Sequence, residues 1–199
     1  MEKPTERGED IRGALRSKYI KARESLSPAE RGTYSSRAAE RIASLPEFRE
    51  AGVVMLYRAV RGELNLDDLP EHPASAGKIF VYPRCVNREE MEAMIPAGWA
   101  KGAFGIPEPA AGSAVVPPES IRLVICPGTA FEDRGGRLGM GAGYYDRFLP
   151  KCIRAVFLMA AFEAQRADSL PQNKTDVPMD LIVTEERVRR IRKGVNRCD

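Results

Sequence analysis

"IRLVICPGTAFEDRGGRLGMGAGYYDRFL", residues 121–149, joins an apolar run to a glycine-rich loop and to the start of a helix. Its first eight residues are rich in β-forming side chains and predict a strand that is buried on both faces. Four further runs of the same kind occupy residues 53–59, 78–84, 154–162 and 180–185. Helical or irregular segments separate the five runs, so the sequence predicts an α/β fold with a parallel, helix-flanked sheet.

Two helices are expected before the first of these strands. From Asp10, apolar residues recur at helical spacing and predict an inward face made of Ile11, Leu15, Tyr19 and Ala22. In "SLSPAER", Ser27 is an expected N-cap, Pro28 suits the first helical turn, and Glu30 completes a capping box. This second helix is expected to end near Ser44.

The totals describe an ordinary globular chain. Its 199 residues are 43% hydrophobic and 30% charged, which predicts a single domain with a sizeable core. Residues 1–9 are expected to be disordered, residues 104–119 to form a long ordered loop, and residues 187–199 to form a basic tail or a solvated helix face. The formal net charge of +3 is too small to imply nucleic-acid binding.

The cysteines and the chain start indicate the compartment. None of the four cysteines forms a Cys-x-x-Cys pair, and the chain has a single histidine, so no zinc site is expected. The polar N-terminus carries no apolar signal segment, and no apolar run is long enough to span a membrane. We therefore expect a reduced, cytoplasmic protein without a membrane partner, and a monomer.

Three of the expected strands end in unusual residues, which are Tyr57-Arg58, Pro83-Arg84 and Pro127-Gly128. In open parallel sheets, ligands bind outside the carboxyl ends of the strands. The glycine loop follows one of these ends by about ten residues. The sequence therefore predicts a ligand site at this edge of the sheet.

The loop itself favours an anionic ligand. Gly139, Gly141 and Gly143 alternate, which lets the backbone take left-handed conformations and approach a ligand closely. Arg137 can fork onto a phosphate, and the acceptor-only side chain of Asp146 suits Mg²⁺ in a phosphate site. The loop is not a Walker A motif, because no Gly-Lys-Ser/Thr follows it. It is not a dinucleotide fingerprint either, because its third glycine comes one residue early and no strand is expected directly before it. A tight structural turn before a helix is the alternative.

The longer stretch "PGTAFEDRGGRLGMGAGYYDRFL", residues 127–149, resembles the signature of the 5-formyltetrahydrofolate cyclo-ligase (methenyltetrahydrofolate synthetase) family. The resemblance covers nearly the whole chain. Further segments fall in family order and spacing: "IRGALR" (11–16), "SLSPAER" (25–31), "RGELNLDDL" (61–69), "VYPR" (81–84), "GIPEP" (105–109) and "LPQNKTDVPMDLIVTE" (170–185).

The resemblance implies a fold and a reaction. The family fold is a three-layer α/β/α sandwich with a mainly parallel sheet, in agreement with the strand pattern. The implied enzyme uses ATP and Mg²⁺ to convert 5-formyltetrahydrofolate to 5,10-methenyltetrahydrofolate, releasing ADP and phosphate. A formamide is a poor electrophile, and phosphorylating the formyl oxygen turns that oxygen into a leaving group. Ring closure by the second folate nitrogen then expels phosphate, and no protein nucleophile is required.

The resemblance also implies roles for residues. ATP binding falls on Arg12, where the family usually has lysine, and on Arg16, Arg137, Leu138, Gly139, Met140, Gly141, Ala142, Gly143, Tyr144 and Tyr145. Folate binding falls on Arg58, Glu63, Met140, Gly141, Ala142, Gly143 and Tyr144. The metal aspartates are Asp146 and Asp176, and the catalytic residues are Arg137, Tyr144 and Asp146. Glu63 can accept hydrogen bonds from the donor edge of the pterin.

Each of these residues also has a plainer interpretation. Arg12 and Arg16 on one helix face are typical of a solvated surface, Asp176 of a turn cap, and Glu63 of a surface acid. A divergent relative that binds nucleotide or folate without turnover is the main alternative function. A nucleic-acid-binding protein, or another enzyme on a related sugar-phosphate or CoA-transferase type of fold, are further alternatives.

Overall fold

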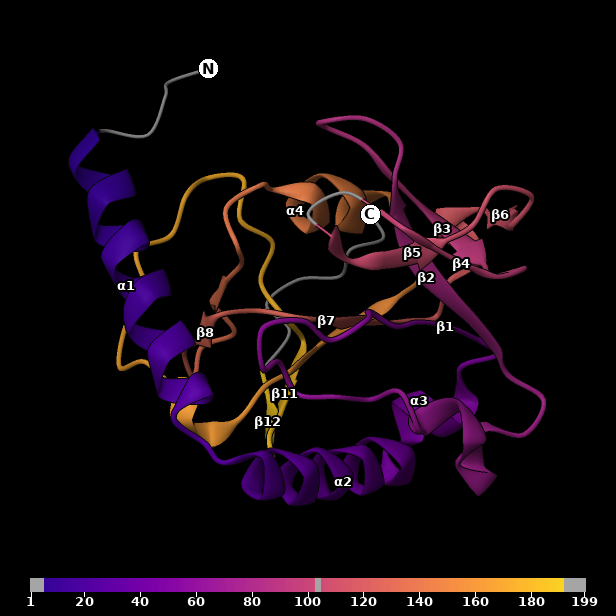
Figure 1. Ribbon diagram of the computed structural model, residues 1–199, viewed down its shortest axis with the longest axis horizontal. Helices are drawn as coiled ribbons and strands as arrows, with labels where there is room; N and C mark the ends of the chain where they lie inside the picture. Colours follow the sequence, from indigo (N-terminus) through magenta and orange to yellow (C-terminus); the bar gives the residue numbers. More distant parts are fainter. Residues whose placement is uncertain (1–5, 103–104, 192–199) are drawn as a thin grey trace.

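An eight-stranded mixed sheet forms the centre of the molecule (Figure 1). The computed structural model describes residues 6–102 and 105–191. Strands run in the order β12-β11-β10-β7-β1-β2-β3-β6. Their bounds are β1 Val53–Met55, β2 Ile79–Cys85, β3 Met91–Ile95, β6 Ala114–Val116, β7 Leu123–Cys126, β10 Val156–Ala160, β11 Leu181–Val183 and β12 Val188–Arg190.

The middle of this sheet is parallel, as the sequence predicted. β11, β10, β7, β1 and β2 pair in parallel, whereas β12, β3 and β6 are added antiparallel at the two edges. All five expected strands form, although each observed strand except β2 is shorter than its apolar run. Two small hairpins lie outside the sheet, made by β4 (Trp99–Lys101) with β5 (Pro107–Pro109) and by β8 (Ala130–Phe131) with β9 (Arg137–Leu138).

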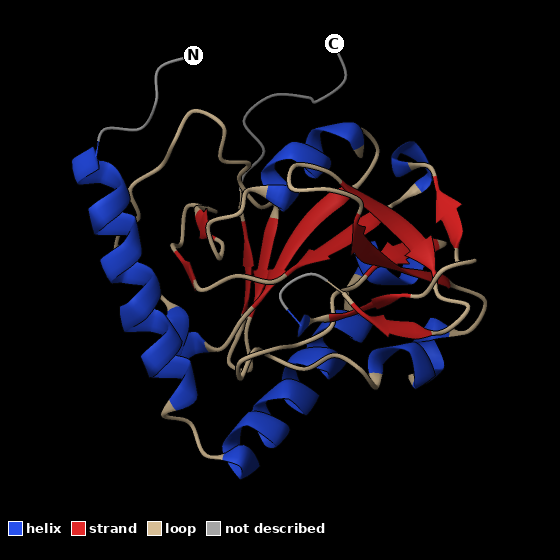
Figure 2. Ribbon diagram, turned by 45° about the horizontal axis from the view of Figure 1, so that its top comes forward, coloured by secondary structure: helices blue, strands red, loops and turns tan. Residues whose placement is uncertain are grey.

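Helices cover both faces of the sheet, which confirms the expected α/β/α layers (Figure 2). On one face α2 (Pro28–Ser44) and α3 (Pro46–Glu50) pack over Val54, Leu123 and Leu158. On the other, α4 (Tyr144–Phe148) packs over Met55, Val124 and other residues that alternate with the first set. Both faces of each central strand are therefore buried, which explains the continuous apolar runs.

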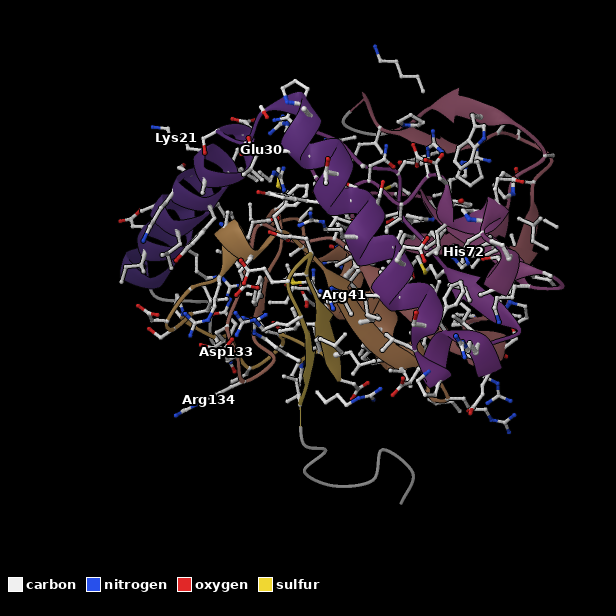
Figure 3. All side chains as sticks on the ribbon, turned by 90° about the horizontal axis from the view of Figure 1, so that it is seen from below. Lys21, Glu30, Arg41, His72, Asp133 and Arg134 are labelled. Carbon is white, nitrogen blue, oxygen red and sulfur yellow. The ribbon has the colours of Figure 1, made fainter. Side chains whose placement is uncertain are left out.

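The expected capping box begins α2. The Ser27 hydroxyl accepts a hydrogen bond from the Glu30 amide at 3.2 Å, and the Glu30 carboxylate accepts one from the Ser27 amide at 2.7 Å. This reciprocal pair satisfies two donors that the helix leaves open. Figure 3 shows α2 crossing the sheet face, with Glu30 near its start and Arg41 over the strands.

The first helix, α1 (Glu6–Glu24), packs inward through three of the four expected residues, which are Leu15, Tyr19 and Ala22. It packs across the β8–β9 hairpin and η6 (Glu163–Gln165) instead of lying on the sheet (Figure 1). Tyr19 is buried as expected, but Ile11 is 50% exposed, whereas Arg12 and Arg23 are buried. The apolar spacing therefore found most of the face, was wrong at Ile11, and left out the two arginines that polar partners hold inward.

Three expectations about irregular segments are wrong. Residues 6–9 begin α1 and are not disordered, while residues 1–5 lie outside the described residues. The expected loop 104–119 contains β5 and β6. In the basic tail, β12 is a sheet strand held by backbone pairing to β11, and residues 192–199 lie outside the described residues. Within the described ranges no helix is long and apolar enough to cross a membrane.

Candidate active site

The carboxyl ends of the central strands carry the candidate site. Because β1, β2 and β7 are parallel, the segments that follow them leave the sheet at one edge. The carbonyls of Pro127 and Gly128, directly after β7, accept hydrogen bonds from arginines of two other segments. The expected edge is therefore a meeting point of several chain segments.

One part of the site, the loop end, is formed by residues 137–146 with Arg12, Arg16 and Asp176. Arg137 donates from Nη2 to Oδ1 of Asp146 at 2.8 Å and from Nη1 to the carbonyl of Pro127 at 3.3 Å. Its side chain is only 3% exposed. Within the described residues its Nε has no hydrogen-bond partner, so the buried guanidinium is not fully satisfied by the protein.

A second ion pair lies beside the first. Arg12 donates from Nη1 and Nη2 to the two carboxylate oxygens of Asp176, at 2.6 Å and 3.1 Å. This forked geometry is the strong form of an arginine–carboxylate pair. The amide of Val177, the next residue, donates to Asp146 Oδ1 at 3.3 Å. The structure therefore brings the two predicted metal aspartates to neighbouring positions, each held by an arginine.

The glycine loop leaves the β8–β9 hairpin. β9 ends at Leu138, so a short strand does precede the loop directly, contrary to the sequence expectation. Arg16 donates from Nε to the carbonyl of Gly139 at 3.1 Å. Gly141 and Gly143 have φ angles of 104° and 70°, and a side chain at Gly141 would lie 3.3 Å from the Arg16 guanidinium. The left-handed conformations expected of the alternating glycines are present at Gly141 and Gly143 but not at Gly139, and the turn at Gly141 keeps the loop close to Arg16.

The hydroxyl groups of the two tyrosines after the loop, Tyr144 and Tyr145, lie in different environments. The Tyr144 hydroxyl donates to the carbonyl of Asn87 at 2.8 Å, which holds α4 to the turn between β2 and β3. The Tyr145 ring lies 5.5 Å from the Arg137 guanidinium. Its hydroxyl is buried without a hydrogen-bond partner among the described residues, and burial raises the pKa of Tyr145 well above its usual value. Tyr144 is therefore the tyrosine nearer the surface.

The other part of the site, the Glu63 end, consists of Arg23 and the turn 60–63. Arg23 is fully buried and donates from Nη1 to Glu63 Oε1 at 3.4 Å. The Glu63 carboxylate also accepts from the Val60 amide at 3.2 Å. Burial raises the pKa of Glu63 above its usual value, and the positive charge of Arg23 opposes that rise. Glu63 is not the surface acid of the plainer interpretation, because it is 9% exposed.

A continuous series of polar contacts joins the two ends. Arg23 Nη1 lies 3.5 Å from the carbonyl of Gly128, whose neighbour Pro127 accepts from Arg137. Arg137 pairs with Asp146, and Asp146 contacts the backbone beside Asp176. Gln165 adds a buried brace, with Nε2 donating to the carbonyls of Gly128 and Thr129 at 2.8 Å and 2.9 Å. Residues far apart in sequence thus form one connected polar site.

Arg58 is an exception within the predicted set. It pairs with Asp67 at 3.0 Å and stacks over the ring of Trp99, with its Cζ 4.8 Å from the ring centroid. Tyr82 meets the same indole edge to face at 4.9 Å. The structure thus places Arg58 in a cluster of its own that the sequence did not predict.

Two hollows border the site. One of about 500 Å³ lies between α2 and residues 59–69 and includes Glu63, Arg31 and Ser35 in its wall. The other, of about 240 Å³, lies between α4 and residues 89–91 and includes Tyr144 and Arg147. The site therefore has open space beside Glu63 and beside the start of α4.

The sequence matches a family model described as the 5-formyltetrahydrofolate cyclo-ligase family over residues 9–185, which includes every residue of both ends. The chain belongs to the 5-formyltetrahydrofolate cyclo-ligase family. Of relatives with this name, the Escherichia coli (strain K12) protein is 27% identical, covering 83% of this chain and 96% of that protein. The Mus musculus protein is 23% identical, covering 86% and 92%.

Solved structures agree with the fold. The NMR structure of Aquifex aeolicus 5,10-methenyltetrahydrofolate synthetase superposes with a TM-score of 0.80 at 36% identity, covering 93% of this chain and 95% of that one. A 5,10-methenyltetrahydrofolate synthetase from Mycoplasma pneumoniae superposes with a TM-score of 0.73 at 24% identity. The predicted family and the predicted fold are both confirmed.

Sequence reasoning missed several residues of this cyclo-ligase site. Arg23 follows Arg16 by seven positions, so helical spacing on the face of Arg12 and Arg16 would have found it. Trp99 and Gln165 carried no such signal, because their partners come from distant segments. Glu132 accepts from the Leu170 amide at 2.8 Å and from Gln172 Nε2 at 2.7 Å. It braces the segment that leads to Asp176.

Proposed function

We propose that this enzyme converts 5-formyltetrahydrofolate to 5,10-methenyltetrahydrofolate at the expense of ATP, which becomes ADP and phosphate. The observation that carries the proposal is the connected polar site within a chain of this family. A carboxylate suited to a pterin and a set of arginines suited to phosphates lie at one sheet edge, joined through the carbonyls of Pro127 and Gly128. A substrate that spans both ends would meet both kinds of group.

The loop end is proposed to bind ATP. Arg12, Arg16 and Arg137 supply positive charge, and the backbone of Gly139–Gly143 supplies a surface that a phosphate can approach closely. The buried Nε atoms of Arg12 and Arg137 lack partners among the described residues, which is consistent with an anion completing their hydrogen bonds. Positioning and charge neutralisation carry phosphoryl transfer, and these groups supply both.

Mg²⁺ is the metal that this chemistry requires, and the residues fit a site that shares the metal with phosphates. Mg²⁺ commonly takes one or two protein carboxylates and completes its shell with water and substrate oxygens. The described residues hold no cluster of three or more acidic, histidine or cysteine ligands, so protein groups alone do not enclose a metal here. Asp146 and Asp176 would hold it, and when bound it would neutralise charge on the transferring phosphate.

The two aspartates differ in which of their carboxylate oxygens already accept hydrogen bonds. The hydrogen bonds to Asp146 from Arg137 and Val177 both fall on Oδ1. In Asp176, Arg12 engages both oxygens, and the Asn173 amide donates to Oδ2 at 2.8 Å. We therefore assign the direct contact first to Asp146, and to Asp176 the additional task of orienting Arg12.

The Glu63 end is proposed to bind the folate. The Glu63 carboxylate would accept hydrogen bonds from the donor edge of the pterin, beside the hollow of about 500 Å³. The formyl oxygen then attacks the γ-phosphorus of ATP and ADP leaves. The second folate nitrogen attacks the activated carbon and loses its proton, and the carbon–oxygen bond breaks to release phosphate. Tyr144, fixed through Asn87, and the backbone of residues 140–143 would flank the reacting part of the substrate.

Arg58 is also proposed to bind the folate. Its stacking on Trp99 and its ion pair with Asp67 leave the side chain 30% exposed. A cation in this setting suits an anionic part of a ligand. Its role is thus separable from that of Glu63.

The decisive experiment is incubation of the protein with 5-formyltetrahydrofolate, ATP and Mg²⁺, followed through the absorbance of the methenyl product. Product should form only when all three are present, with one ADP released per ring closed. Folded protein that binds both substrates without forming product would instead support a non-catalytic relative.

A further inference from the structure

We propose that Arg23 is the positioning residue of the Glu63 end: it holds the turn that presents Glu63 and ties the carboxylate to the strand end at Gly128. The inference rests on the proposed function, because it concerns the residue assigned to folate recognition. Arg23 has no exposed surface and cannot touch a substrate unless the site opens. Its action is therefore through Glu63.

The burial of Arg23 is the first observation. Arginine is almost never fully buried unless it is paired, because desolvating its charge is costly. Here the pair with Glu63 is long, at 3.4 Å, and Nη2 has no hydrogen-bond partner among the described residues. An apolar side chain would fill the same space at lower cost to stability. Packing alone thus does not account for an arginine at this position.

The turn before Glu63 is the second observation. Arg61 and Gly62 have φ angles of 48° and 71°, two successive left-handed residues of which one is not glycine. Such a conformation is unfavourable for a residue other than glycine and persists where other contacts hold it. Arg23 Nε donates to the Arg61 carbonyl at 3.0 Å, while Glu63 and Val60 exchange hydrogen bonds of 3.0 Å and 3.2 Å. Arg23 thus holds both the turn and the carboxylate that the turn presents.

The third observation is the link to the other end. Arg23 Nη1 also approaches the Gly128 carbonyl at 3.5 Å, and Gln165 holds that carbonyl from the opposite segment at 2.8 Å. Gly128 follows β7, and its neighbour Pro127 accepts from Arg137. A single side chain from the last turn of α1 therefore sets the position of Glu63 relative to the strand end that carries Arg137.

The charged groups around Glu63 define what Arg23 does electrostatically. Arg23 faces it from α1, Arg61 from its own turn, Tyr57 from the end of β1, and Tyr145 from α4. Burial raises the pKa of Glu63, and Arg23 is the largest opposing influence. Removing Arg23 therefore moves the pKa of Glu63 further upward, and a protonated Glu63 has lost acceptor capacity toward a pterin.

The test compares Arg23→Gln and Arg23→Lys with wild type and with a matched control, Arg41→Gln. Arg41 is a partly buried helix arginine whose Nε donates to the Glu185 carbonyl at 3.2 Å, away from Glu63. The first measurement is the titration of the Glu63 side-chain carbon by NMR in ligand-free protein. We expect it to move to higher pH in Arg23→Gln and to stay in place in Arg41→Gln. An unchanged titration in Arg23→Gln overturns the proposal.

The second measurement is steady-state kinetics. Arg23→Gln should raise the KM for 5-formyltetrahydrofolate about tenfold, the equivalent of 1.4 kcal/mol, and leave the KM for ATP nearly unchanged. Arg23→Lys keeps the charge but cannot make all three contacts. Its folate KM should lie between those of wild type and Arg23→Gln, with the Glu63 titration close to wild type. Equal rises in both KM values would indicate a merely structural role and overturn the proposal.

Two features keep the test decisive. If Arg23→Gln does not fold, Arg23→Lys carries the same KM comparison, and a rise for ATP equal to that for folate overturns the inference. The NMR titration uses no substrate, so it judges the inference even if the proposed reaction is absent. Wild-type protein with a shifted Glu63 titration but no cyclisation would contradict the function and leave the Arg23–Glu63 coupling standing.

Discussion

The loop end and the Glu63 end of the site both rest on arginine–carboxylate pairs, but the pairs are built differently. At the loop end, Arg137–Asp146 and Arg12–Asp176 are short, at 2.8 Å and 2.6 Å, and their aspartates are 20% and 15% exposed. At the Glu63 end, the side chains of Arg23 and Glu63 are 0% and 6% exposed, and Arg23 Nη1 lies 3.4 Å from Glu63 Oε1. The short pairs face solvent on one side, whereas the long pair is enclosed.

With ATP and its metal assigned to the loop end and the folate to the Glu63 end, as proposed above, this difference indicates two ways of preparing a site for ligands. At the loop end, an incoming polyphosphate is negative like the aspartates, and its metal is positive like the arginines. The arginines would therefore pair with the phosphates and the aspartates with the metal, which leaves few charges unpaired. At the Glu63 end, the buried pair remains when the ligand binds, and its geometry is set in advance. Binding at the first end reorganises charge, and binding at the second uses a prepared acceptor.

The largest effect is expected from Asp146→Asn at the loop end. Loss of this carboxylate should lower turnover by roughly 100-fold or more, because metal-based charge stabilisation is worth several kcal/mol of barrier. It should also raise the Mg²⁺ concentration needed for half-maximal rate. The measurement is rate against Mg²⁺ at fixed ATP, with Asp176→Asn run alongside and expected to show a smaller shift. Coincident curves for wild type and Asp146→Asn would remove Asp146 from the metal site.

The sequence predicted the grouping of residues at the loop end better than that at the Glu63 end, because most loop-end residues are close together in the chain. Arg137, the glycines and Asp146 lie within ten residues, so local spacing is enough to group them. The central strands were equally clear, because a strand buried on both faces needs a continuous apolar run. On α1 the apolar spacing found Leu15, Tyr19 and Ala22 but not Arg23, since apolar periodicity does not register an arginine that distant acceptors hold in a buried position.

The edge strand β12 shows the same limit of local sequence patterns. β12 was interpreted as part of a basic tail because its arginines look solvated in the sequence. In the structure Arg189 pairs with Glu163 and Asp133, and the strand pairs with β11. Its partners lie 26 and 56 residues away, so no local pattern could reveal them.

At the Glu63 end, Glu63→Gln should weaken folate binding by about 10- to 100-fold and leave ATP binding nearly intact. Hydrogen bonds that involve a charged group contribute roughly 1.5–3 kcal/mol, and glutamine also leaves Arg23 without its anionic partner. Titration of each ligand separately measures the split. A Glu63→Gln protein whose folate affinity matches wild type would show that the prepared acceptor is not used.

The same carboxylate predicts a pH effect that the loop end should not share. Burial holds the pKa of Glu63 above its usual value, so the carboxylate protonates at a higher pH than an exposed glutamate. The folate KM of wild type should therefore rise as the pH falls through that raised pKa, and the rise should be absent in Glu63→Gln. KM values for both substrates, measured across the acidic range, check this. Parallel changes for ATP and folate would contradict a Glu63-specific origin.

The smallest effect is expected at the exposed ion pairs of Asp133, outside the site. They serve as a reference for the pairs at the loop end and at the Glu63 end. Asp133, in the turn between β8 and β9, pairs with Arg166 and Arg189 at 2.7 Å each, and its side chain is 48% exposed (Figure 3). Hydrogen bonding from Arg166, followed by that from Arg189, holds the pKa of Asp133 below its usual value.

A lowered pKa means that this pair stabilises the fold above the ordinary pKa of aspartate, about 3.9, and that the contribution is lost as the pH falls through the lowered value. Because solvent screens the pair, Asp133→Asn should reduce the free energy of unfolding by less than about 1 kcal/mol at neutral pH. Added salt should shrink the difference, because mobile ions screen exposed charges. Urea unfolding at neutral pH and below pH 3.9, with and without salt, measures it. A loss at neutral pH of several kcal/mol, as expected when one partner of a buried ion pair is removed, would contradict the weak contribution assigned to this exposed pair.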